Sequence, residues 1–155
     1  MRLYLKQRVF SWSDTFDIYN EYQEVIYQAK ADILTLSHQI HVFDGIGEIG
    51  FIDQQVFTLL PRFDLTHRGN YVGELKKRFS PLSPYYTLDN SDWKISGDLF
   101  AHDYIATNDV GETIFTIEKA YLSWGDYYCL NVNKDEDAEL ALLVSIAIDA
   151  ATCQD

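Results

Sequence analysis

Short segments in which apolar and polar residues alternate follow one another along most of the chain. Examples are Phe16-Asp17-Ile18, Ile40-His41-Val42 and Phe63-Asp64-Leu65. A period of two residues is typical of a β-strand that buries one of its faces. Clusters containing Asn, Asp or Gly, which favour tight turns, separate these segments. The clusters are residues 20–23, 44–47, 67–70, 89–92, 108–111 and 131–137. The pattern therefore predicts a succession of β-hairpins.

A repeat of two strands per unit runs through this pattern. Each unit has one large apolar residue, usually followed by a small or hydroxylated residue, where we expect the chain to pass from one strand to the next. These anchor residues are Phe10, Leu34, Phe57, Phe79, Phe100 and Tyr121. Their spacings of 24, 23, 22, 21 and 21 residues indicate six units, and hence about twelve strands. We expect sequential strands to pair antiparallel, and the anchors to fill bends of the fold.

The C-terminal segment is of a different kind. Acidic residues at 135–139 precede the run Leu140–Ile148, which has no polar face. Acidic residues favour a helix N-terminus, and a helix that is apolar all round is a buried helix. We predict a helix at about residues 137–151, with a strand at Val144–Ile148 as the alternative.

A sheet of about twelve strands tends to curl and close, which removes its unpaired edges. Its lumen is then too wide for wall side chains alone to fill. The sequence thus predicts a single domain, residues 1–155, that is mainly β: a closed antiparallel barrel around a central apolar C-terminal helix.

Charge and composition narrow the possible functions. The chain of 155 residues has a formal net charge of −12, which opposes non-specific binding to nucleic acid. Apolar and polar residues alternate from the N-terminus onward, and no apolar core of signal-peptide length is present there. We therefore expect a cytoplasmic protein. The apolar run is shorter than the about 20 residues that span a bilayer, so no transmembrane segment is expected. Cys129 and Cys153 lack metal-ligand spacing and are interpreted as reduced thiols.

Catalytic and metal-binding motifs give weak signals. No segment matches a phosphate-binding Gly-rich loop, a nucleophile elbow or a paired-His metal helix, and no cofactor is expected. His38 and His41 are spaced so that a strand would send them to opposite faces. His102-Asp103 could be an acid/base pair, although an isolated acidic turn is the simpler interpretation. These patterns favour a protein that is not an enzyme.

Two similar corners begin with tryptophan. Trp12-Ser13-Asp14 and Trp124-Gly125-Asp126 occupy equivalent positions in the first and last units, which a closed barrel would bring together. We interpret each Trp as filling a bend and each Asp as capping a turn. A shared binding site at the barrel rim is the alternative.

A basic cluster is the best candidate for a binding role. Residues 62–78 contain five cations against two carboxylates, a local net charge of +3. The five cations are Arg62, Arg68, Lys76, Lys77 and Arg78. On a strand, Lys76 and Arg78 share one face while Lys77 takes the other. Converging cations could hold a phosphate or an anionic lipid head group. A solvated strand face is the alternative interpretation.

Several segments resemble the LURP-one-related (LOR) family, namely Arg8–Phe16, His38–Asp44, Lys77–Phe79, Leu122–Tyr128 and Ile146–Ala151. The resemblance covers essentially the whole chain. It implies membership of the tubby C-terminal-domain-like superfamily, with a twelve-stranded barrel around an apolar helix, and a relation to phospholipid scramblases. The tubby domain binds phosphoinositides.

We therefore expect a non-enzymatic binding or scaffolding module whose partner is a protein or an anionic lipid head group. Anionic phospholipid or phosphoinositide binding at a membrane surface is the alternative. An enzyme with an unrecognised site is a weaker one.

Overall fold

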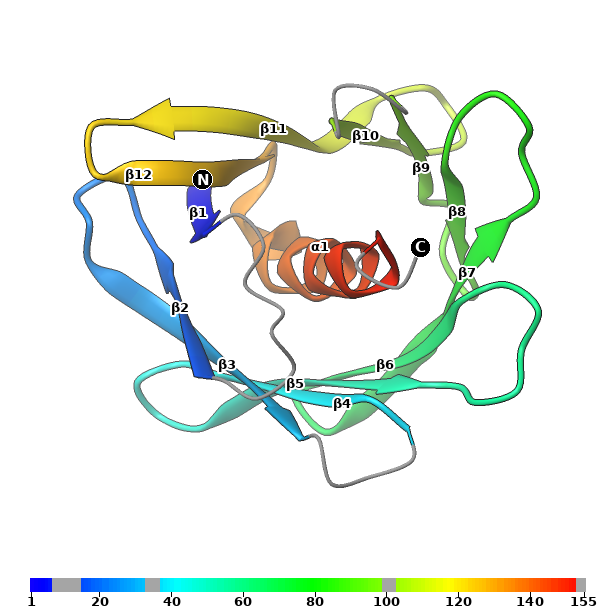
Figure 1. The fold of residues 1–155 in the computed structure, drawn as a ribbon, viewed down its shortest axis with the longest axis horizontal. Helices are drawn as coiled ribbons and strands as arrows, with labels where there is room; N and C mark the ends of the chain where they lie inside the picture. The colour runs from blue at the N-terminus through cyan, green and yellow to red at the C-terminus, as the bar shows by residue number, and fades with distance from the viewer. Residues whose placement is uncertain (7–14, 33–36, 99–102, 153–155) are drawn as a thin grey trace.

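Twelve antiparallel strands form a closed barrel in the computed structural model, which describes residues 1–6, 15–32, 37–98 and 103–152. The strands are β1 (Arg2–Lys6), β2 (Thr15–Tyr19), β3 (Val25–Asp32), β4 (Gln39–Phe43), β5 (Glu48–Gln54), β6 (Arg62–His67), β7 (Asn70–Arg78), β8 (Tyr85–Leu88), β9 (Lys94–Gly97), β10 (Tyr104–Thr107), β11 (Thr113–Leu122) and β12 (Gly125–Val132). Each strand pairs with its sequence neighbours, and β1 closes the barrel against β12 (Figure 1). The prediction of a closed twelve-stranded barrel is confirmed.

A single helix fills the barrel (Figure 1). A short 3₁₀ turn, η1 (Asp135–Asp137), leads into α1 (Ala138–Thr152), and every residue from Ala141 to Ile148 is buried. The predicted helix is confirmed to within one residue at each end, and the alternative of a strand at 144–148 is wrong. The run is helical because its Ala and Leu residues favour that state and the barrel wall contacts it on all sides.

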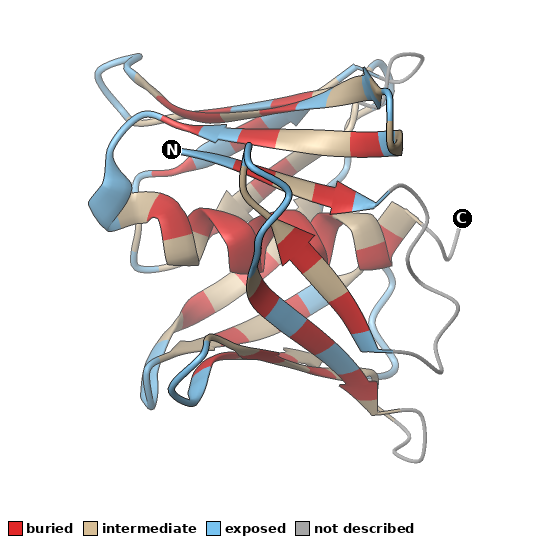
Figure 2. Cartoon of the chain, turned by 90° about the vertical axis from the view of Figure 1, so that its left-hand side faces the viewer, coloured by how far each residue is buried: buried red, intermediate tan, exposed pale blue. Residues whose placement is uncertain are grey.

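The wall residues alternate as the sequence predicts, with bands of buried residues along the strands in Figure 2. On β6, for example, Phe63 and Leu65 are buried while Asp64 between them is not. The wall also approaches the helix closely at Gly50 of β5, where an added Cβ would overlap the methyl groups of Leu143. Glycine there allows the helix and the wall to pack without a gap.

The two ends of the barrel differ in their connections. At the turn end, short turns at residues 20–24, 44–47, 68–69, 89–93 and 108–112 join strands, and η1 begins the helix. At the loop end, residues 55–61, 79–84 and 123–124 connect strands, and α1 reaches its C-terminus. Figure 2 shows the helix running from one end to the other. The turn clusters and the anchors of the sequence therefore belong to opposite ends.

Three of the anchor residues do not fill bends. Phe57, Phe79 and Tyr121 are exposed at the loop end, so the expectation that they fill bends of the fold is wrong for them. The helix and the inward wall residues already occupy the interior, and the connecting loops lie beyond it. Phe10, Leu34 and Phe100 lie outside the described residues.

The Trp124 ring fills its corner, as the sequence suggested. Its ring packs against Tyr127 at 4.3 Å between centroids, and edge-on to Tyr4 and Tyr19 at 5.8 and 5.7 Å. The contacts join β1, β2 and the β11–β12 hairpin where the barrel closes. Trp12 lies outside the described residues.

Candidate functional site

Three of the five predicted cations meet on the outer surface of β6 and β7. Arg62 begins β6 and is directly paired with Lys76 of β7, and Arg78 ends β7. We call Arg62, Lys76 and Arg78 the basic edge. Lys77 follows the strand alternation to the other face, where it is paired with buried Tyr86.

Neighbouring groups hold the basic edge in place. The Lys76 Nζ lies 2.8 Å from an oxygen of Asp89, and Lys76 and Arg62 share Glu74 at 3.5 and 3.7 Å. The Arg78 Nε donates a 2.8 Å hydrogen bond to the hydroxyl of Thr87. Because a hydroxyl is neutral, this bond does not neutralise the charge of Arg78. The ion pairs of Lys76 and Arg62 are partly exposed and therefore weak.

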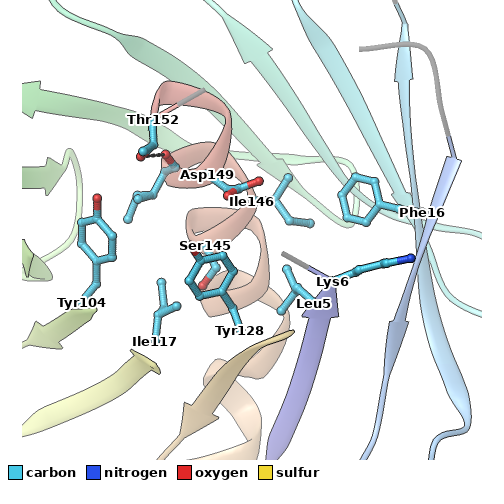
Figure 3. A pocket seen from close by; sticks show the side chains of 11 residues that line it. Leu5, Lys6, Phe16, Tyr104, Ile117, Tyr128, Ser145, Ile146, Asp149 and Thr152 are labelled. Atoms are coloured by element: carbon cyan, nitrogen blue, oxygen red, sulfur yellow. Dashed lines mark hydrogen bonds between the residues drawn. The ribbon is translucent and has the colours of Figure 1, made fainter. Parts of the chain in front are cut away.

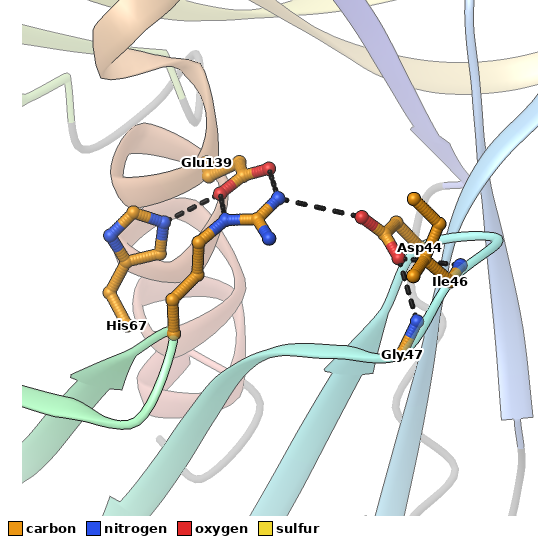
Figure 4. A network of polar contacts seen from close by, with 6 residues as sticks. Asp44, Ile46, Gly47, His67 and Glu139 are labelled. Carbon is orange, nitrogen blue, oxygen red and sulfur yellow. Dashed lines mark hydrogen bonds and ion pairs between the residues drawn. The ribbon is translucent and has the colours of Figure 1, made fainter.

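Arg68 lies at the other end of the molecule. It occupies the β6–β7 turn, and its guanidinium holds Glu139 of α1 through hydrogen bonds of 2.9 Å from Nε and 2.7 Å from Nη2 (Figure 4). The expectation that it joins the other cations is wrong, because the six steps along the chain from Arg62 to Arg68 span roughly 20 Å of extended strand.

This contact is part of a network that fixes the start of the helix (Figure 4). The His67 Nε2 lies 2.6 Å from Glu139, and Asp44 lies 3.5 Å from Arg68. The hydrogen bonds from Arg68 lower the pKa of the Glu139 carboxyl below its ordinary value. Backbone N–H groups of Gly47 and Ile46 bond Asp44 and lower its pKa. The network is therefore structural, tying α1 to two turns.

Exposed apolar side chains stand beside the basic edge on two loops. The β5–β6 loop presents Phe57 and Leu59, which are 102% and 99% exposed, and the β7–β8 loop presents Phe79 and Leu82, which are 84% and 86% exposed. We call these four residues the apolar tips. The loop residue Pro61 accepts a 3.0 Å backbone hydrogen bond from Lys77. That bond holds the β5–β6 loop against the end of β7.

Phe57 combines full exposure with an unusual backbone. Its φ is 58°, in the left-handed region that costs an L-residue about 1–2 kcal/mol. For a bulky side chain such a conformation is uncommon, and exposure means that no interior contact offsets the cost. Strain retained in an exposed loop is a feature of functional segments.

The turn end has the opposite character. Its connections are rich in carboxylates, namely Glu21, Glu24, Asp44, Asp92, Asp109, Glu112, Asp135, Glu136 and Asp137. Exposed apolar residues there, such as Ile46 and Val110, lie among acidic neighbours. Within the part of the chain that the structure describes, apolar tips and cations therefore coincide at the loop end.

The predicted histidine and cysteine candidates lie in ordinary surroundings. The Nδ1 atoms of His38 and His41 lie 2.8 Å from Gln54 and 3.1 Å from Glu48. Asp103 accepts a 3.1 Å hydrogen bond from the backbone of Lys119, whereas His102 lies outside the described residues. Among residues 1–6, 15–32, 37–98 and 103–152, no three His, Cys, Asp or Glu side chains are grouped so as to hold a metal.

Cys129 is half-buried, and burial raises the pKa of its thiol. A raised pKa keeps the sulfur protonated and weakly nucleophilic. Cys153 lies outside the described residues.

Comparison with known proteins decides the family. The family model described as LURP-one-related matches residues 1–149. The chain belongs to the LURP-one-related family. The LOR match extends from β1 into the last turn of α1, so it includes all twelve strands and most of the helix.

This LOR chain is also similar to "Uncharacterized protein YxjI" of Bacillus subtilis (strain 168), at 28% identity over 157 residues. The match covers 100% of this chain and 96% of the relative. No solved structure matches the chain. Over the described residues, no helix is long and apolar enough to cross a membrane.

Proposed function

We propose that this LOR protein is a non-enzymatic binding module that docks through the loop end of its barrel onto an anionic phospholipid surface. The observation that carries the proposal is the coincidence of the apolar tips with the basic edge. Because α1 fills the interior, binding through the outer surface and loops also suits the fold.

The two parts of the surface have complementary roles at a membrane. Phe57, Leu59, Phe79 and Leu82 are the kind of side chain that gains from leaving water, by about 1.5–3 kcal/mol each when fully buried. The cations attract an anionic lipid surface, each contributing about 1 kcal/mol. Stable attachment to a membrane generally requires two such signals together.

The acidic turn end supports one orientation on the membrane. A net charge of −12 repels an anionic surface as a whole, so attachment depends on presenting the loop end. The carboxylate-rich turns then point away from the lipid. This asymmetry also makes binding sensitive to ionic strength.

Liposome co-sedimentation tests the proposal. The vesicles are phosphatidylcholine alone, phosphatidylcholine with phosphatidylserine, and phosphatidylcholine with a phosphoinositide. We expect binding to both anionic compositions and little to the neutral one. Stronger binding to the phosphoinositide at equal surface charge would identify a head-group site at the basic edge, and equal binding would identify a general charge effect.

Matched variants locate the surface. Phe57→Ser and Arg78→Glu should each reduce anionic vesicle binding several-fold. The control variants Ile46→Ser and Lys134→Glu make the same chemical changes at the turn end and should leave binding unchanged. Thermal unfolding of each variant confirms folding. Absence of vesicle binding, or an equal effect of loop-end and turn-end variants, would overturn the proposal.

A further inference from the structure

A small cavity lies beside the C-terminal half of α1, between the helix and the strands β1, β2, β10, β11 and β12 (Figure 3). Most of its wall is apolar and is formed by Leu5, Phe16, Ile117 and Ile146, with the rings of Tyr104 and Tyr128 beside them. The space open to the centres of water-sized spheres is about 40 Å³. That is room for roughly three waters, which together occupy about 90 Å³ as liquid. An organic molecule of about three non-hydrogen atoms, compared on the same liquid basis, has a similar volume.

One carboxylate lies in this apolar space. Asp149 follows the fully buried stretch of α1, is itself half-buried, and lines the cavity. Burial raises the pKa of its carboxyl to about 6. The last turn of α1 contains no basic residue, and the partial negative charge of a helix C-terminus further disfavours an anion.

The hydroxyl groups of the helix near Asp149 are already committed. The Ser145 hydroxyl donates to the Ala141 carbonyl at 2.7 Å, and the Thr152 hydroxyl donates to the Ile148 carbonyl at 2.9 Å. Both protons therefore satisfy the helix itself. A carboxylate in an apolar cavity has the most to gain from a cation that brings its own hydrogen-bond donors.

Charged and titratable groups on the facing strands are Lys6 of β1, Tyr104 of β10 and Tyr128 of β12. Figure 3 shows the Lys6 side chain directed away from Asp149. The cavity wall includes the aromatic rings of Phe16, Tyr104 and Tyr128, and aromatic faces attract organic cations.

We propose that this cavity is a binding site for a small organic ammonium ion, whose charge pairs with Asp149 and whose carbon atoms contact the apolar wall. The site lies inside the barrel and uses none of the apolar tips or the basic edge. It is therefore independent of attachment to a membrane, and the experiment below contains no lipid.

A pair of probes of equal size isolates the charge. Ethylammonium and ethanol are titrated separately into the full chain at about pH 8, with binding followed by calorimetry and by the methyl NMR signals of Ile117 and Ile146. We expect the ammonium to bind at least about tenfold more tightly than the alcohol, a difference of about 1.4 kcal/mol. Its affinity should fall toward that of the alcohol as the pH is lowered below the pKa of Asp149.

Two variants locate the effect. Asp149→Asn should abolish the preference for the ammonium, whereas Asp126→Asn removes an equal charge from the exposed start of β12 and should preserve it. The Asn side chain has the same shape, and circular dichroism verifies that both variants are folded. Equal affinity for the two probes, an unchanged preference in Asp149→Asn, or binding of neither probe would each overturn the proposal.

Discussion

Replacement of Asp149 by Asn should change the pH dependence of stability in a defined way. The carboxyl has an ordinary pKa of 3.8, and burial in the folded protein raises it to about 6. The unfolded chain therefore loses this proton first as the pH rises, so ionisation favours unfolding. Stability associated with Asp149 is fully present below its ordinary pKa and is lost as the pH rises through about 6.

The magnitude follows from the size of the shift. A difference of about two pH units corresponds to about 3 kcal/mol, because each unit is worth about 1.4 kcal/mol. Part of the cost is already present near pH 4, where the unfolded carboxyl is half ionised. Between about pH 4 and about pH 8, we expect Asp149→Asn to become more stable than the parent by an additional 2 kcal/mol or so.

Urea unfolding of both proteins at these two pH values measures this difference. The comparison between pH values cancels any constant cost of burying the Asn amide. The exposed Asp126 provides the matched control, because Asp126→Asn removes the same charge without removing a buried group. A free-energy difference between parent and Asp149→Asn that stays constant with pH would refute the assignment of a half-buried carboxylate with a raised pKa.

Three further outcomes are expected. Glu139→Gln should lower the free energy of unfolding by about 1–3 kcal/mol near pH 7, since it loses charged hydrogen bonds. The loss should shrink as the pH falls through the lowered pKa of Glu139. Urea unfolding measures it near pH 7 and again at a pH below that pKa, and an equal loss at the two pH values would contradict the expectation. Gly50→Ala should cost about 1–3 kcal/mol by forcing Leu143 to move, and less when Leu143→Ala is already present, as a double-mutant cycle would measure. Phe57→Gly should raise stability by about 1 kcal/mol by relieving left-handed strain, while weakening vesicle binding; a lower melting temperature would argue against the strain.

The barrel and helix could be predicted because both leave one-dimensional signals. Alternation with a period of two specifies a wall with one buried face, and the run Leu140–Ile148 has a character that only an enclosed helix satisfies. Even the separation of turn clusters from anchors was visible in the spacing. These features depend on local pattern and on solvent exclusion, which a sequence records directly.

The fate of the anchors could not be predicted in the same way. An aromatic residue that recurs once per unit can fill a bend or project from it, and the choice depends on how far α1 extends along the barrel. Phe57, Phe79 and Tyr121 project because the interior is already filled. Their recurrence records a shared position at one end of the barrel, and it says nothing about burial.

The position of Arg68 depended on strand direction and length. Proximity in the sequence grouped Arg68 with Arg62 and Lys76. In the structure Arg68 lies beyond the far end of β6, where it binds Glu139. The turn residues around Arg68 and Gly69 were the available signal, since a turn at the end of a strand places its cation away from the strand's start. The role of Asp149 could be inferred only from the cavity in the structure. In the sequence, an acidic residue after an apolar run also marks an ordinary helix end.

The two proposed binding activities use different residues at the same end of the barrel. Attachment to lipid depends on exposed side chains such as Phe57 and Arg78, whereas ammonium binding depends on Asp149 inside the wall. Loss of vesicle binding in Phe57→Ser with retained ammonium binding, and the converse in Asp149→Asn, would establish two sites that act independently. The contacts of Arg68 and Glu139 at the turn end hold the helix in both cases, so neither proposal requires the barrel to open.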